Sequence, residues 1–217
     1  MSGKNYLDLM QFFEGYVRNY RRLNLTGDHN RSMMTNREID YFANLGEMLG
    51  FDSFVEDSKF DKIKNRSRPM DLAWWRWDSL GDMEHYDHLA LHLERENSFN
   101  KDLDTIDKLF SETENEYIPH NVIGIQTLNS NEKIEELNKV VKGRNSCQQS
   151  KVLMVYRYPD VEKELERVSA YLFTPRKADV AKHAVCKRDD FGYWFMCFEK
   201  EYKFYEAKTA KKEVQLL

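Results

Sequence analysis

Helical and extended patterns alternate through the second half of this 217-residue chain, and this alternation is the feature that most constrains its fold. Residues 101–110 (KDLDTIDKLF) and 131–141 (NEKIEELNKVV) have helical patterns, whereas residues 121–128 (NVIGIQTL) and 151–158 (KVLMVYRY) are apolar runs of strand length. Strands that alternate with helices are typical of an α/β fold. We expect the C-terminal remainder, with SAYLFT and GYWFMCFEKEYKFYEA, to add further strands in antiparallel order.

Two amphipathic helices are expected before the first strand. In the first, apolar side chains recur at three- and four-residue spacing between Leu9 and Tyr20. The second is predicted to begin at Thr35, a favourable N-cap residue, with Glu38 as its capping-box partner, and to end at Gly50.

No Gly-, Pro- or Ser-rich stretch divides the chain, so we expect one α/β domain at residues 31–217, preceded by an N-terminal helical extension at residues 1–30. The sequence contains no run of eighteen apolar residues, and its first residues carry too much charge for a signal peptide. We therefore expect a soluble cytoplasmic protein with no membrane partner.

Charge and cysteine content exclude some classes of protein. A formal net charge of −4 excludes a histone-like basic protein, although an acidic protein can still bind nucleic acid through a local basic patch. The three cysteines form no metal-binding spacing, and their odd number argues against a disulfide framework, so we expect reduced thiols.

Carboxylates gather near the ends of two expected strands. In LALHLEREN, leucines alternate with polar residues, so Glu94 and Glu96 should leave the strand on one face while the leucines enter the core from the other. Asp71 lies early in the preceding strand, MDLAWWRW, and a hairpin would bring the three carboxylates together.

Three close carboxylates raise one another's pKa unless a cation neutralises them. Hard oxygen ligands of this kind suit Mg²⁺ or Mn²⁺, which bind one or two protein carboxylates together with waters and a substrate phosphate. Hydrolysis of a phosphodiester is the chemistry that follows, with Glu96 placed to orient or deprotonate water.

The order of elements from residue 35 to residue 158 resembles that of the PD-(D/E)XK, or restriction-endonuclease-like, nucleases. The residues that carry the resemblance are a helix bearing Glu38, a short strand, Asp71 in "RPMDLAWW", the acidic strand end "HLEREN" and a following helix. The resemblance implies a mixed central sheet flanked by helices, with a divalent-metal site at one sheet edge. It makes Asp71 and Glu94 metal ligands and Glu38 an outer-shell or second-metal carboxylate.

The chain departs from the family pattern at one motif position. Glu96 stands where the family has lysine, and "PMD" stands where "PD" is expected. Some family members carry Glu-x-Glu, and in others the lysine moves to the next helix, where this chain offers Lys108 as a catalytic residue.

A basic loop precedes Asp71 and would place positive charge beside the site, as the binding of nucleic-acid phosphates requires. Its cations include Lys62, Lys64, Arg66 and Arg68. A solvated loop without a ligand is an equally good interpretation of this segment.

Simpler interpretations exist for several of these residues. Glu94 and Glu96 can be solvated charges at a strand end. His88 and His92, on the same face, can be surface histidines rather than ligands of a transition metal. Trp74, Trp75 and Trp77 fit a core better than a platform for stacking bases.

Three hypotheses about function follow from these residues. The leading one is a Mg²⁺- or Mn²⁺-dependent nuclease, with DNA favoured over RNA as substrate. The second is a nuclease-like domain without catalysis that binds nucleic acid or protein. The third is an assembly protein whose aromatic C-terminal strands form the interface of a homodimer or a larger oligomer.

Overall fold

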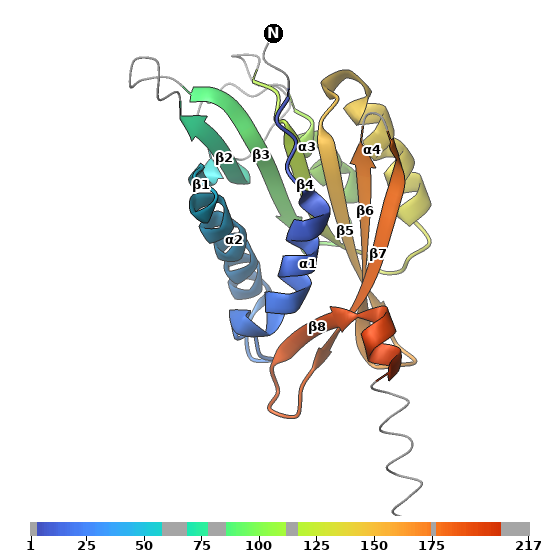
Figure 1. The fold of residues 1–217 in the computed structure, drawn as a ribbon. Coiled ribbons are helices and arrows are strands. Elements are labelled where there is room, and N and C mark those ends of the chain that lie inside the picture. The colour runs from blue at the N-terminus through green and yellow to red at the C-terminus, as the bar shows by residue number, and fades with distance from the viewer. Residues whose placement is uncertain (1–3, 58–68, 78–85, 112–116, 175–176, 205–217) are drawn as a thin grey trace, which may run out of the picture.

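The computed structural model describes residues 4–57, 69–77, 86–111, 117–174 and 177–204 (Figure 1). Its elements, in chain order, are α1 (Leu9–Asn19), the 3-10 helix η1 (Tyr20–Leu23), α2 (Arg31–Met48), β1 (Asp52–Asp57), β2 (Met70–Trp77), β3 (Tyr86–Glu96), α3 (Asp102–Leu109), β4 (Asn121–Thr127), α4 (Ile134–Gln148), β5 (Lys151–Asp160), β6 (Leu165–Thr174), β7 (Lys177–Arg188) and β8 (Trp194–Phe198). The segment 58–68, which contains Lys62, Lys64, Arg66 and Arg68, lies outside the described residues.

The strands form one mixed sheet in the order β1-β2-β3-β4-β5-β6-β7-β8. Its centre is parallel, because β3 pairs with β4 and β4 with β5 in the same direction. Its two flanks are antiparallel meanders, β1-β2-β3 and β5-β6-β7-β8. The predicted α/β class, with a mixed central sheet flanked by helices, is confirmed.

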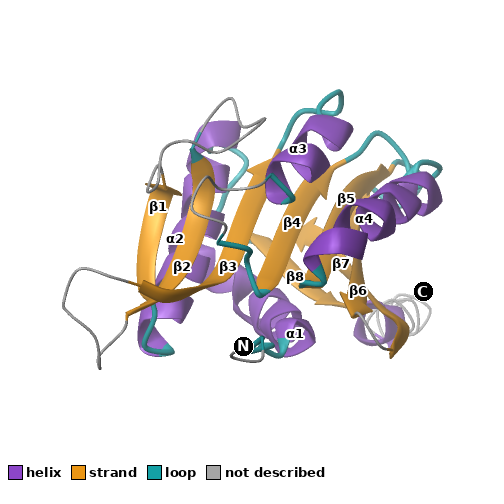
Figure 2. Ribbon diagram, turned by 90° about the horizontal axis from the view of Figure 1, so that it is seen from above, coloured by secondary structure: helices purple, strands orange, loops and turns teal. Residues whose placement is uncertain are grey.

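Helices cover both faces of the sheet, with α3 and α4 on one face and α1 on the other (Figure 2). The parallel strands explain α3 and α4, because a parallel connection needs a crossover, which is usually a helix. β3 and β4 are joined through α3, and β4 and β5 through α4.

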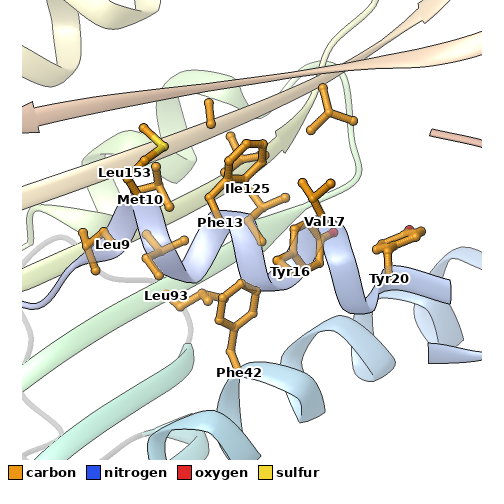
Figure 3. Close-up of a cluster of buried hydrophobic side chains, with 14 of the residues drawn as sticks. Leu9, Met10, Phe13, Tyr16, Val17, Tyr20, Phe42, Leu93, Ile125 and Leu153 are labelled. Carbon is orange, nitrogen blue, oxygen red and sulfur yellow. The ribbon is translucent and has the colours of Figure 1, made fainter. Parts of the chain in front are cut away.

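The larger of the hydrophobic cores lies between the sheet and the two N-terminal helices. Phe13 and Tyr16 of α1 pack beside Phe42 of α2 over Leu93 and Ile125 of the sheet (Figure 3). The expected N-terminal extension therefore packs as one side of the same core as the sheet. A second core joins α3 and α4 to the other face.

Two of the three tryptophans of β2 lie in the core, as the simpler interpretation predicted, whereas Trp77 is only partly buried. Trp74 and Trp75 are both almost fully buried. Trp74 stacks on Phe51 with ring centroids 5.7 Å apart, whereas Trp75 meets Tyr117 edge-on at 5.2 Å. Neither ring is available to a base.

The predicted start of the second helix is wrong. α2 begins at Arg31, and Asn30 is its N-cap, since the side-chain oxygen of Asn30 accepts a hydrogen bond from the Met33 N–H at 2.9 Å. Asn caps a helix at least as well as Thr. Thr35 instead lies inside the helix and donates its hydroxyl to the Arg31 carbonyl.

The C-terminal segment is only in part extended. Residues 194–198 form β8, but residues 199–204 are helical. The Phe198 N–H donates to the Glu201 carboxylate at 3.0 Å, and a carboxylate that accepts from the main chain at this point favours a helix start. No helix in the described part of the chain combines the length and the hydropathy needed to cross a membrane.

Two helical glycines should respond oppositely to substitution by alanine. At Gly46 in α2, a new Cβ would lie 2.5 Å from the Trp74 ring, whereas at Gly143 in α4 it would meet nothing within 4 Å. We expect Gly46→Ala to destabilise the protein by about 1–3 kcal/mol through overpacking. Gly143→Ala should stabilise it by about 0.5–1 kcal/mol through helix propensity. Urea unfolding measures the change in the free energy of unfolding for each variant. If both changes have the same sign, the packing of α2 on β2 is contradicted.

Candidate active site

A cavity of about 690 Å³ opens where β3 ends and β2 begins, between α2 and α3. It contains most of the carboxylates that the sequence singled out. The lining residues are Ser32, Thr35, Asn36, Ile39, Asp40, Val55, Glu56, Pro69, Asp71, Glu94, Arg95, Glu96, Asn97, Lys101 and Lys108. Five of these carry a carboxylate and three carry a cation, so charge of both signs is concentrated here.

Asp71 and Glu94 lie side by side on the antiparallel pair β2 and β3, as a hairpin predicts. The Asp71 N–H donates to Glu94 Oε1 at 2.9 Å, and Asp71 Oδ2 accepts from the Arg95 N–H at 2.8 Å. Each carboxylate is thus bonded to the main chain of the opposite strand. This reciprocal arrangement fixes both groups at the strand ends.

Lys108 reaches the same pair from the last turn of α3. Its ammonium lies 2.5 Å from Glu94 Oε1 and 4.0 Å from Asp71 Oδ1. The Lys108 side chain is 14% exposed, so it meets the carboxylates within the protein rather than in solvent. Three of the four residues expected to be catalytic are therefore in direct contact.

Burial and the neighbouring Asp71 raise the pKa of Glu94 to about 7, and Lys108 only partly offsets this effect. The simpler interpretation of Glu94 as a solvated charge is wrong, since Glu94 is 6% exposed. β3 was expected to bury only its leucine face, but it lies between β2 and β4 under helices on both sides of the sheet, so both of its faces are buried.

Glu96, the fourth expected residue, lines the same cavity on the same strand face. Its Oε1 accepts from the Ser98 N–H at 2.7 Å, which holds the turn after β3. Glu56 is a further carboxylate of the cavity that the sequence reasoning missed. It lies on β1 with a left-handed φ of 51°, and no local sequence signal identifies it.

Glu38 does not line this cavity, and the structure gives it a different environment from the one expected. Its two oxygens accept hydrogen bonds from Arg95, Arg157, Tyr16 and Tyr20 in the core between α1, α2 and the sheet. Despite burial, the two guanidinium groups hold its pKa at about 2. A carboxylate that lies outside the cavity with both oxygens bonded in this way is not placed to bind a metal ion there, so we do not retain Glu38 as a metal ligand.

The two histidines of β3 are not brought into the cavity. His88 bonds to Asp87 at 2.7 Å and stacks on His120 with ring centroids 4.5 Å apart. His92 is buried at 1% exposure. Neither histidine is among the residues that line the cavity.

Among the described residues, no group of three or more His, Cys, Asp or Glu side chains is placed to hold a metal ion. The Asp71–Glu94 pair meets a smaller requirement, because Mg²⁺ commonly takes one or two protein carboxylates and completes its shell with water and phosphate. Two adjacent carboxylates, one with a raised pKa, form a hard-oxygen donor set that a divalent cation would stabilise. These residues therefore fit such an ion.

Comparisons with protein-family models and with curated proteins give no match for this chain. Among solved structures, it is similar to the crystal structure of the central domain of yeast acetyl-CoA carboxylase, with a TM-score of 0.34 and 7% sequence identity. The alignment covers 80% of this chain and 35% of that chain. A similarity at this level carries no argument about family or activity.

The raised pKa of Glu94 predicts a pH-dependent stability. Between its ordinary pKa of 4.5 and about 7, the folded protein binds a proton at Glu94 that the unfolded chain does not. The free energy of unfolding should therefore fall by about 3 kcal/mol as the pH rises through this window. Glu94→Gln removes the titrating group. Between about pH 4 and pH 8, the free energy of unfolding in urea should therefore fall by about 3 kcal/mol more in the wild type than in the variant.

Glu96→Gln is the matched control for this measurement, because Glu96 shares the strand and the cavity with Glu94. It should keep the pH slope of the wild type. A Glu94→Gln variant with an unchanged slope would show that Glu94 is not the titrating group.

Proposed function

We propose that this protein is a metal-dependent nuclease of the PD-(D/E)XK type, with Asp71, Glu94 and Lys108 at its centre. One observation carries the proposal, namely that Lys108 of α3 contacts the adjacent carboxylates of β2 and β3 in one cavity. The order α2-β1-β2-β3-α3-β4, with a mixed sheet, agrees with what the sequence resemblance implies. The contact of Lys108 with Glu94 also agrees with a family lysine that has moved to the helix after the acidic strand.

The three side chains supply complementary chemistry for the hydrolysis of a phosphodiester. Asp71 and Glu94 would hold Mg²⁺ or Mn²⁺, which when bound lowers the pKa of water and polarises the phosphate. Lys108 can donate to a phosphate oxygen and so stabilise the negative charge that develops there. Glu96 lines the same cavity, where its carboxylate can orient water or accept a proton.

The nucleic-acid partner is also a proposal. DNA is favoured over RNA, with the segment containing Lys62, Lys64, Arg66 and Arg68 as the expected phosphate-binding element. Asp71 follows this segment closely in the chain, and phosphate contacts of this kind position a nucleic acid on a protein.

A second function has its own supporting observation. The Lys108 ammonium already lies 2.5 Å from Glu94, so the carboxylate pair has a cation beside it without any metal. A protein of this kind would bind nucleic acid or protein without cleaving it. Metal binding and cleavage separate the two functions.

Cleavage is tested with single- and double-stranded DNA and RNA in the presence of Mg²⁺ or Mn²⁺. Asp71→Asn and Lys108→Met should each lower kcat by about 10²–10⁴-fold, because each removes a group that acts on the reacting phosphate or on the metal. The matched controls are Asp107→Asn and Lys139→Met, which alter surface ion pairs on α3 and α4. Cleavage that survives Asp71→Asn would exclude this site, and binding without cleavage by the wild type would favour the second function.

Calorimetry with Mn²⁺ tests the role of Lys108 more directly. If a metal takes the position beside Asp71 and Glu94, the Lys108 ammonium repels it. Lys108→Met should then bind Mn²⁺ about threefold to tenfold more tightly than the wild type while it loses cleavage. Glu94→Ala should lose binding, and unchanged affinity in both variants would place the metal elsewhere.

A further inference from the structure

The residue between the two glutamates of β3 connects the site to the opposite face of the sheet. The Arg95 side chain points away from Glu94 and contacts the Glu38 carboxylate. Its Nη1 also donates to the Glu96 carbonyl at 2.8 Å and to the Thr127 hydroxyl at 3.1 Å. The Arg95 side chain is therefore fixed by partners on α2, β3 and β4.

The main chain of Arg95 is in turn a partner of the site. Its N–H donates to Asp71 Oδ2 at 2.8 Å, while Asp71 donates its own N–H to Glu94. A shift of Arg95 would therefore displace one carboxylate of the pair and weaken the contact that holds the other. The Glu38 ion pair and the Asp71 hydrogen bond meet at a single residue.

Glu38 is itself held by the N-terminal helices. The hydroxyls of Tyr16 and Tyr20 each donate to Glu38 Oε1 at 2.9 Å, and Arg157 of β5 contacts the same oxygen at 2.5 Å. Both tyrosines are almost fully buried. A chain of buried polar contacts thus runs from α1 and η1 through Glu38 and Arg95 to Asp71.

We propose that Glu38 is a positioning residue for the Asp71–Glu94 pair, acting through Arg95, and that Tyr16 and Tyr20 hold Glu38 for this role. Any effect of Glu38 on cleavage rests on the proposed nuclease function. Its effect on the positions of the Asp71 and Glu94 carboxylates does not depend on that function. Partners of this kind orient metal ligands, and their loss typically lowers metal affinity about 10–100-fold.

A purely structural role for Glu38 makes a different prediction. Removal of a carboxylate from a buried ion cluster lowers stability wherever the cluster lies. Glu166 of β6 provides the matched control, because it bonds to the other side of Arg157 at 3.0 Å and does not line the cavity. Glu38→Gln and Glu166→Gln should both lower Tm, but only the first should disturb the site.

The decisive measurement is amide hydrogen exchange at Arg95, read by NMR relative to the amide of Val155 in the middle of β5. Glu38→Gln should accelerate this relative rate about tenfold and weaken Mn²⁺ binding in calorimetry by about tenfold, whereas Glu166→Gln should change neither. If Glu38→Gln does not fold, Tyr16→Phe/Tyr20→Phe keeps both ion pairs and should change the same two quantities by about threefold.

Each outcome decides one claim. An Arg95 exchange rate equal to that of the wild type, in a folded variant that is less stable, overturns the positioning role. If the wild type binds no Mn²⁺ but Arg95 exchange responds to Glu38→Gln, the positioning role stands and the nuclease function fails. If Mn²⁺ binds and neither quantity responds, the metal site stands and Glu38 is a core residue alone.

Discussion

The fold depends on a carboxylate that is buried between two guanidinium groups. Removing Glu38 from water costs several kcal/mol, and only well-placed cations and donors offset that cost. Arg95 and Arg157 hold its pKa at about 2, so its contribution to stability is present above the ordinary pKa of 4.5 and is lost as the pH falls toward about 2. Two tyrosine hydroxyls complete its bonds. Helices α1 and α2 and strands β3 and β5 must therefore all be in place before this charge is stable.

The same sheet carries a second buried glutamate whose environment acts in the opposite direction. Glu94 is nearly as buried as Glu38, but its neighbours are one ammonium and one competing carboxylate, and its pKa rises to about 7. Burial alone therefore does not decide the charge of either group. The partner set makes Glu38 a fixed anion of the core, and it leaves Glu94 near the midpoint of its titration at neutral pH, where a bound cation has the largest effect.

Local patterns predicted the strands and helices of the central part of the chain. The alternation in β3 and the position of Asp71 in β2 also predicted that Asp71 and Glu94 would meet, because a hairpin fixes which residues are neighbours. The contact between Lys108 and Glu94 came from a resemblance and not from spacing. The partners of Glu38 could not be predicted, since Arg157 is 119 residues away in the chain and only tertiary packing brings the two together. The start of α2 was misplaced because Asn30 and Thr35 are both good N-caps, and local sequence does not choose between them.

The packing of α1 against β8 has a consequence for the order of folding. The two meanders join strands that are adjacent in the sequence, so each can form soon after its residues leave the ribosome. In contrast, Phe13 of α1 meets Phe198 of β8 edge-on at 6.3 Å, across almost the whole described chain. The apolar face of α1 therefore waits without its final partner until β8 has been synthesised. During that interval the part of this face that β8 will cover is open to capture by chaperones or by other nascent chains.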